Sequence, residues 1–217
     1  GTLWGWGYNN AGQLGINNTN SRSSPVQIGS LSYWNKIEGG FNNLLAIQSN
    51  PPTTLDLGSR YVTKDYVLDA YPNGIVGNVG LWGWGKNIDL GNLGNGTTST
   101  PYSSPVQIGS LTNWKIISSY LAGTIAVKAD GTLWAWGDTN LQSPSSTSTP
   151  YQIGTNTNWN YANKGYPSFA IKNDGTLWGW GTPGSYLGLG IIATYQSPVQ
   201  IGALTDWKIV KTNDRNT

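Results

Sequence analysis

Three recurring sequence elements predict an all-β fold, specifically a β-propeller built from four-stranded blades. The first is a pair of tryptophans on either side of one small residue, the second is a proline-containing hexapeptide, and the third is a single tryptophan that follows it. Each element occurs four times, and together they account for all twelve tryptophans. Repeats of about 40–50 residues with several short strands are typical of propeller blades. The doublets begin at Trp4, Trp82, Trp134 and Trp178, the hexapeptides at residues 24, 104, 149 and 197, and the single tryptophans are Trp34, Trp114, Trp159 and Trp207.

Each repeat divides into four short strand-like runs, which in residues 114–154 are WKII, TIAVKA, TLWAWG and PYQIG. Asp130-Gly131 joins the second run to the third, and Asp-Gly indicates a tight hairpin because glycine adopts positive φ without penalty. Pro150 has no N–H to donate to a neighbouring strand, so the last run suits the edge of a sheet. No segment shows sustained helical periodicity, and we expect almost no helix.

The tryptophan doublet predicts how the blades hold together. Successive side chains of a strand alternate between its two faces, so Trp134 and Trp136 share one face while Ala135 lies on the other. Stacking the sheets lets the bulky face of one unit fill the space over the small face of the next. We therefore predict that the doublet tryptophans form the structural core between sheets: Trp4, Trp6, Trp82, Trp84, Trp134, Trp136, Trp178 and Trp180.

The spacing of the repeats divides residues 1–217, taken as one propeller domain, into complete and partial blades. The first complete blade contains an insertion at residues 49–79. The predicted blades are a partial one at 1–29, complete ones at 34–109, 114–154 and 159–202, and a partial one at 207–217.

Several of these motifs resemble the repeats of the regulator of chromosome condensation family, whose members form seven-bladed propellers. The motifs are LWGWGYNNAGQLG at 3–15, SPVQIG, and the hairpin AIKNDGTLWGWG at 170–181. The resemblance implies that the four repeats are part of a longer chain and a larger, seven-bladed ring. The alternative is a smaller or open array of blades. Leu14, Leu93 and Leu187 hold the Leu-Gly position of the family in three repeats, whereas the third repeat, at 138–150, is expected to have lost that element.

The sequence departs from the family where its members carry Gly-x-x-His-Thr. The corresponding stretches are FNNLL at 41–45, LAGTI at 121–125 and YPSFA at 166–170, none of which contains histidine. We therefore do not expect the nucleotide-exchange, chromatin-binding or light-sensing activities of individual family members. The phrases SSPVQI and DGTLWGWG are similar to bacterial and bacteriophage versions of the repeat, including virion proteins.

The residue types present exclude several classes of function. The chain has no His and no Cys, which removes the usual general base of catalytic triads and the common zinc ligands. Its formal net charge is only +2, and its Lys and Arg residues are scattered rather than clustered to follow phosphates. No apolar run is long enough to span a membrane. We expect a non-enzymatic protein with no catalytic residue, cofactor, metal site, nucleic-acid partner or membrane insertion.

The insertion at 49–79 is the predicted partner-binding segment. Tyrosine and arginine are enriched at binding hot spots, and long loops on rigid scaffolds often carry function. The alternative is an elongated hairpin that packs on its own blade or on a neighbouring subunit. The candidate contact residues are Arg60, Tyr61, Lys64, Tyr66 and Tyr71.

These observations predict a structural and recognition propeller, located on a virion surface or extracellularly. We expect it in a phage tail, fibre or capsid surface, where it contacts other protein subunits or a protein or glycan of the host surface. The alternative is a secreted, lectin-like adhesin in which tryptophans at the rim stack on sugars. The single tryptophans are the candidates for that role because each begins the inner strand of a blade: Trp34, Trp114, Trp159 and Trp207.

Overall fold

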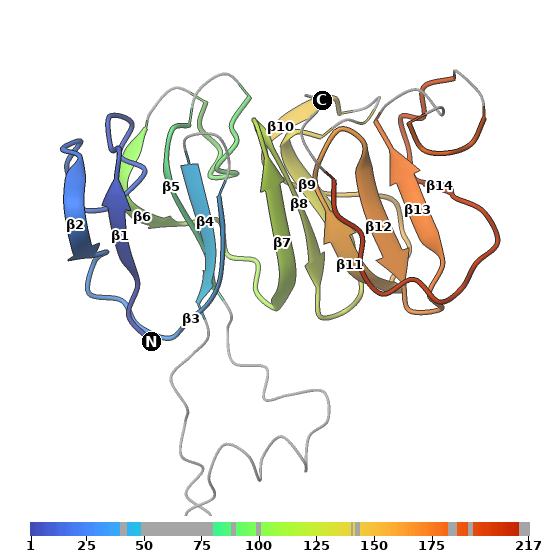
Figure 1. Ribbon diagram of the computed structural model, residues 1–217, viewed down its shortest axis with the longest axis horizontal. Coiled ribbons are helices and arrows are strands. Elements are labelled where there is room, and N and C mark those ends of the chain that lie inside the picture. Colours follow the sequence, from blue (N-terminus) through green and yellow to red (C-terminus); the bar gives the residue numbers. More distant parts are fainter. Residues whose placement is uncertain are drawn as a thin grey trace, which may run out of the picture.

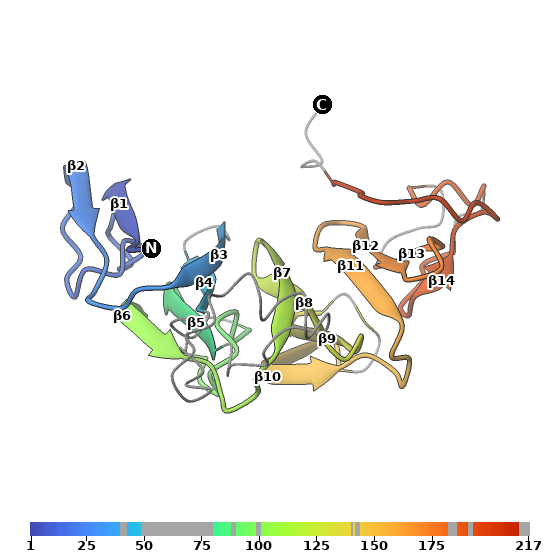
Figure 2. The same cartoon turned by 90° about the horizontal axis from the view of Figure 1, so that it is seen from below.

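The computed structural model describes residues 1–39, 43–48, 80–87, 90–98, 101–139, 141, 144–181, 186–190 and 193–212. Every regular element in these residues is a β-strand, so the predicted all-β class is confirmed. The strands form four antiparallel sheets, which we number in chain order. Figure 1 shows the sheets side by side from the blue N-terminal end to the red C-terminal end, and Figure 2 shows that they follow an open arc. The described residues include no helix that could cross a membrane.

The first sheet has two strands and the other three have four strands each. The first consists of β1 (Trp4–Gly7) and β2 (Arg22–Gln27). The second consists of β3 (Trp34–Gly39), β4 (Asn43–Gln48), β5 (Gly80–Gly85) and β6 (Tyr102–Gln107). The third consists of β7 (Trp114–Tyr120), β8 (Gly123–Lys128), β9 (Leu133–Asp138) and β10 (Ser146–Gln152). The fourth consists of β11 (Trp159–Asn163), β12 (Ser168–Lys172), β13 (Leu177–Trp180) and β14 (Val199–Gln200).

Within each sheet the strands lie in chain order, as in β3-β4-β5-β6. Pro105 and Pro150 lie in β6 and β10, which are the last strands of their sheets and pair on one side only in the described part of the chain. Proline is tolerated there because an edge strand does not need every N–H for pairing. The predicted four-stranded blade with proline on its edge strand is therefore confirmed.

The Asp-Gly turns form tight hairpins between the second and third strands of the last two sheets. Gly131 has φ 79° and Gly175 has φ 78°, the left-handed region that glycine adopts readily. Asp130 Oδ1 accepts hydrogen bonds from the backbone N–H of Thr132 at 3.0 Å and from its hydroxyl at 2.6 Å. Asp174 and Thr176 repeat this arrangement. The DGT sequence thus fixes the start of the tryptophan strand.

A bulge follows the single tryptophan in the inner strand of each four-stranded sheet. In the third sheet Trp114 pairs with Lys128 while Ile116 pairs with Val127, so Lys115 is the extra residue. The bulge turns Trp114 and Ile116 to opposite faces of the sheet. Trp114 packs in the cluster shared with the second sheet, and Ile116 packs against the cluster shared with the fourth.

The core consists of three apolar clusters, one at each junction between successive sheets. At the middle junction, Leu93 and Ile108 of the second sheet pack with Ile117 and Trp136 of the third. Apolar contact between sheets therefore connects each blade to its neighbours, as in a repeat array.

Residues 207–210 were expected as the first strand of a further blade, but the structure assigns no strand to residues 204–212. The Trp207 N–H donates to the carbonyl of Gly175 at 3.2 Å, as the Trp159 N–H does to Gly131. Tyr161 donates its hydroxyl proton to the Val210 carbonyl at 3.2 Å. The segment is thus placed against the fourth sheet, but no described strand offers it a ladder of backbone hydrogen bonds.

Candidate functional site

The predicted contact segment lies outside the described residues. This applies to the whole insertion at 49–79, and therefore to Arg60, Tyr61, Lys64, Tyr66 and Tyr71. The described residues form the tryptophan layers, parts of the loops that connect the two outer strands of each blade, and the junctions between sheets.

The second tryptophan of three doublets is completely buried and reaches the preceding sheet. Trp84, Trp136 and Trp180 are each 0% exposed. Trp84 donates its Nε1–H to the carbonyl of Gln13 at 3.0 Å, and Trp180 donates to that of Thr139 at 3.4 Å. These acceptors belong to the loops of the first and third sheets. The second tryptophan therefore joins each sheet to the one before it.

The small residue between two tryptophans makes room for apolar side chains of its own sheet. A Cβ atom on Gly83 would lie 3.2 Å from Leu93 Cδ2 and 3.3 Å from Ile108 Cδ1. These two side chains then pack in one cluster with Trp136 of the next sheet. Leucine and isoleucine side chains thus lie between the small residue of one sheet and the tryptophans of the next. The sequence prediction did not include this layer.

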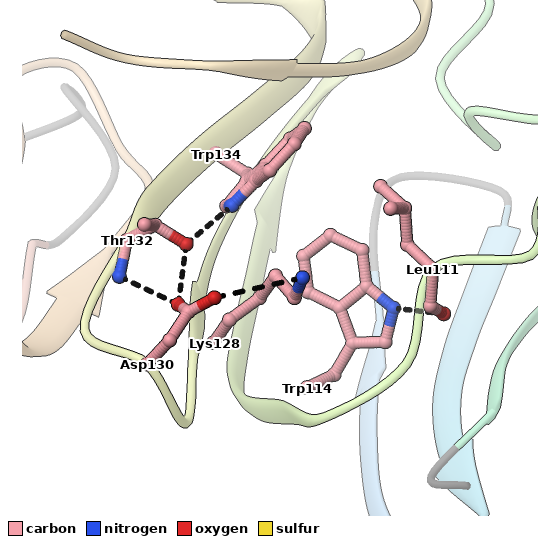
Figure 3. Close-up of polar contacts among 6 residues, drawn as sticks. All are labelled: Leu111, Trp114, Lys128, Asp130, Thr132 and Trp134. Carbon is pink, nitrogen blue, oxygen red and sulfur yellow. Dashed lines mark hydrogen bonds and ion pairs between the residues drawn. The ribbon is translucent and has the colours of Figure 1, made fainter. Parts of the chain in front are cut away.

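The first tryptophan of each later doublet is half-buried, and in the last two doublets it is held by the turn before it. In the third sheet Trp134 Nε1 donates to the hydroxyl of Thr132 at 2.8 Å, and Thr132 donates in turn to Asp130 (Figure 3). The Nζ atom of Lys128 lies 3.7 Å from Asp130 and 5.5 Å from the centroid of the Trp134 ring. Partial burial acts to raise the pKa of Asp130, but the bonds from Thr132 and the nearby Lys128 lower it overall.

The single tryptophans also pack inside the blades rather than forming a platform at the rim. Trp114 and Trp159 are buried, and Trp34 is half-buried. Trp114 meets Trp134 edge-on with ring centroids 6.0 Å apart, and its Nε1–H donates to the Leu111 carbonyl at 3.0 Å (Figure 3). Such edge contacts stabilise aromatic pairs beyond simple burial. The buried Trp114 and Trp159 therefore do not present a face for a sugar, whereas Trp34 and Trp207 are half-buried.

Trp4 and Trp6 depart from the predicted core, because 52% of Trp4 and 62% of Trp6 is exposed. Tyr8, which follows them, is also exposed. Among the described strands β1 pairs only with β2, and no described strand or sheet packs on its other side. The first sheet thus presents an exposed aromatic face, defined by Trp4, Trp6 and Tyr8.

A buried asparagine organises the loop that follows the doublet, which the sequence prediction missed. Asn87 accepts the Leu93 N–H on Oδ1 at 3.1 Å and donates Nδ2–H to the Thr97 carbonyl at 3.0 Å. Asn9 makes the same pair of contacts in the first repeat. The recurring Asn that follows the doublet was the available sequence signal.

The third repeat retains the buried leucine that it was expected to have lost. Leu141 is buried in the cluster shared with the fourth sheet. Its N–H donates to the Thr139 hydroxyl oxygen at 3.2 Å, and that hydroxyl donates to the Pro144 carbonyl at 2.5 Å. A threonine hydroxyl thus replaces the asparagine amide, although the glycine after the leucine is absent.

We expect Asn87→Ala to lower the free energy of unfolding by about 2 kcal/mol. The substitution leaves the buried Leu93 N–H and Thr97 carbonyl without partners, and each unpaired buried group costs about 1–3 kcal/mol. Urea-induced unfolding followed by circular dichroism measures the change. Asn160→Ala, at an exposed position whose amide oxygen contacts Lys115, is the control and should change it little. Equal effects of the two substitutions would contradict this role of Asn87.

The RCC1 family comparison rests on the first repeat. The family model of the regulator of chromosome condensation (RCC1) repeat matches residues 1–47, which include the doublet, the leucine loop, the hexapeptide and the single tryptophan. Residues 1–47 of the chain thus match the RCC1 repeat. The recognition made from the sequence motifs is therefore confirmed.

Solved structures show the same fold over almost the whole chain. Human WBSCR16 is similar with a TM-score of 0.69 and 19% identity, over 94% of this chain and 49% of that one. Prp20p of Saccharomyces cerevisiae has a TM-score of 0.66 and 17% identity, over 94% and 47%. A chain in the crystal structure of Kap60 bound to yeast RCC1 (Prp20) has a TM-score of 0.52 and 14% identity, over 94% and 57%. The chain thus spans about half the length of the solved chains that it matches, and the predicted propeller fold is confirmed.

A buried lysine lies at the junction between the third and fourth sheets of this RCC1-type arc. Lys164 follows β11 and is only 4% exposed. Its N–H donates to the Ser118 hydroxyl oxygen at 3.0 Å, and a Cβ atom on Gly123 would lie 2.5 Å from its Cε. Burial lowers the pKa of Lys164 to about 8, and the charge of Asp138 opposes that shift. No sequence pattern marked this residue.

The described residues contain no group of three His, Cys, Asp or Glu side chains that could hold a metal ion. What the described chain offers chemically is a set of polar loops, one exposed aromatic face and the junctions between sheets. These features suit binding through shape, aromatic contact and backbone hydrogen bonds.

Proposed function

We propose that this RCC1-repeat chain is a non-enzymatic recognition scaffold that binds protein partners, as a component of a virion such as a phage tail, fibre or capsid surface. The observation that carries the binding part is the shared fold. The crystal structure of Prp20p was described together with its binding to Gsp1p and histones, and yeast RCC1 (Prp20) was solved with Kap60 bound. The phrasing of the repeats, which is similar to bacteriophage versions, supports the virion setting.

The packing of the sheets supports a scaffold role. Fully buried tryptophans at the junctions give each sheet a dense apolar contact with its neighbour, which limits movement between blades. Loops on such a rigid framework keep their relative positions, and partners can bind with little loss of conformational freedom. We place the protein on a virion surface or outside the cell.

Mass spectrometry of virions purified by density gradient tests this proposal. We expect tryptic peptides of this chain to copurify with particles and to remain after a high-salt wash, because apolar contacts are not screened by salt. Chemical cross-linking of the same particles should join the chain to one defined structural protein. Recovery of the chain only from the soluble cytoplasmic fraction would contradict the proposal.

The exposed aromatic face favours a second candidate, the secreted carbohydrate-binding adhesin. Trp4, Trp6 and Tyr8 are three of the exposed aromatic side chains, and an exposed aromatic ring can stack on a sugar. Titration with a panel of glycans, read by tryptophan fluorescence, tests it. A response that disappears in Trp6→Ala would support the adhesin, and no response across the panel would count against it.

A further inference from the structure

At the first two junctions, the loop after a tryptophan doublet rests on the edge strand of the next sheet. In the first junction Gly12 lies so close to β6 that an added Cβ would be 2.7 Å from Ser103 Cα, and the Asn17 N–H donates to the Ser103 carbonyl at 2.6 Å. In the second, Gly91 lies equally close to Ser148 of β10, and the Gly96 N–H donates to the Ser148 carbonyl at 2.7 Å. The same loop-on-strand contact therefore occurs twice.

At the third junction the described residues do not make this contact. Ser103 and Ser148 stand two residues before the edge-strand proline, and the residue in that position of the fourth repeat is Gln196. In the described part of the third sheet, no N–H donates to the Gln196 carbonyl. The loop is also shorter: the segment between the paired ends of the two outer strands is 8–21 in the first sheet, 86–101 in the second and 139–145 in the third.

A groove of about 490 Å³ lies where the loop would rest. Leu141, Tyr151, Ile153 and Gly154 line it from the third sheet, and residues 194–197 line it from the fourth. None of these side chains is charged. Its volume is in the usual range for a ligand site.

Tyr151 distinguishes this junction from the others. The first two sheets carry valine at the corresponding position, directly after the edge-strand proline. Tyr151 pairs with Ala135 in the sheet, so it lies on the face that meets the fourth sheet, and 43% of it is exposed. The groove therefore has an apolar floor and an accessible aromatic wall.

We propose that this groove binds a glycine-containing loop of a partner protein. The partner loop takes the place that the chain's own loops occupy at the other two junctions. The glycine of the partner loop approaches the 194–197 segment, where a side chain would collide. A backbone N–H of the partner loop donates to the Gln196 carbonyl. One apolar side chain of that loop packs on Leu141 and Tyr151. This inference rests on the proposed function in that the ligand is a protein.

Nuclear magnetic resonance of the isotope-labelled chain, titrated with a synthetic peptide, tests the proposal. The probe is NIDLGNLGNGTT, the sequence of residues 87–98, which contains the loop of the second junction. We expect saturable shifts of the Gly154, Gln196 and Ser197 amide signals at millimolar peptide. The same peptide with alanine in place of Gly91 should bind at least tenfold more weakly, because the added Cβ meets the edge strand.

Two variants of the chain locate the binding. Tyr151→Val restores the residue of the other sheets and should weaken peptide binding about tenfold, as loss of a tyrosine hot spot does. Ile37→Val, at an exposed position on the second sheet, should leave it unchanged. No saturable shift, or equal binding of the alanine peptide, would overturn the proposal. Shifts of the same amides by monosaccharides but not by peptide would overturn it in favour of a sugar site. The assay needs no virion, so its failure is distinct from failure of the proposed function.

Discussion

Trp136→Ala is expected to lower the free energy of unfolding by about 3–5 kcal/mol, the usual cost of deleting a buried indole. Trp136 is 0% exposed and packs with Leu93 and Ile108 of the preceding sheet. The substitution opens a cavity at the middle junction, where the sheets on both sides limit relaxation. Urea-induced unfolding followed by far-ultraviolet circular dichroism measures the loss.

Trp6→Ala is the matched control, because Trp6 occupies the same place in a doublet but is 62% exposed. We expect its effect to stay within about 0.5 kcal/mol. A comparison of phenylalanine variants separates packing from hydrogen bonding. Trp84→Phe removes the bond to the Gln13 carbonyl. Trp136→Phe removes no such bond, because Trp136 Nε1 has no partner in the described residues. Trp84→Phe should therefore lower the free energy of unfolding by about 1 kcal/mol more than Trp136→Phe does. Similar losses in Trp6→Ala and Trp136→Ala would refute the layered core.

Lys164→Met is expected to stabilise the chain at pH 7 by up to about 3 kcal/mol, and to lose this advantage as the pH rises. The folded chain holds the Lys164 ammonium with a pKa of about 8, against 10.5 for an ordinary lysine. This difference corresponds to about 3 kcal/mol. Between pH 8 and pH 10.5 the unfolded chain binds more protons than the folded chain, so the free energy of unfolding of the wild type rises with pH. Below pH 8 the buried ammonium lowers the wild-type stability by the full amount.

Unfolding of the wild type and of Lys164→Met at several pH values from 7 to 11 measures this effect. The difference between the two proteins isolates Lys164, because other groups titrate alike in both. Lys208→Met, at an exposed position, is the control and should show no such trend. A stability difference that stays constant across this range would rule out a charge penalty at Lys164.

The regular parts of the fold were predictable because each depends on neighbouring residues in the chain. Asp130, Gly131 and Thr132 form their turn with local hydrogen bonds, and the alternation of Trp134 and Trp136 with Ala135 follows from strand geometry. The edge position of the last strand followed from its proline. These features recur in each repeat, so that one repeat supports the interpretation of another.

The remaining features depend on contacts between distant residues. Trp84 has the same sequence context as Trp6, and it is completely buried because the preceding sheet packs on it. The Thr139 hydroxyl can replace an asparagine amide because it both accepts from the Leu141 N–H and donates to the Pro144 carbonyl. The exchange of residue type hides the motif from sequence comparison. The groove at the third junction lies beside the shorter loop of the third sheet. It could not be predicted from that loop alone, because residues of the fourth sheet form its other wall.

The tryptophan contacts all point toward the N-terminus: Trp84 reaches the first sheet, Trp136 the second and Trp180 the third. A ribosome releases the chain in this same direction, and domains emerge and fold from the N-terminal end. Each new sheet therefore finds its docking surface already made when its second tryptophan leaves the exit tunnel. The array can grow one blade at a time during translation, so the interval in which a bare indole is available for aggregation is short.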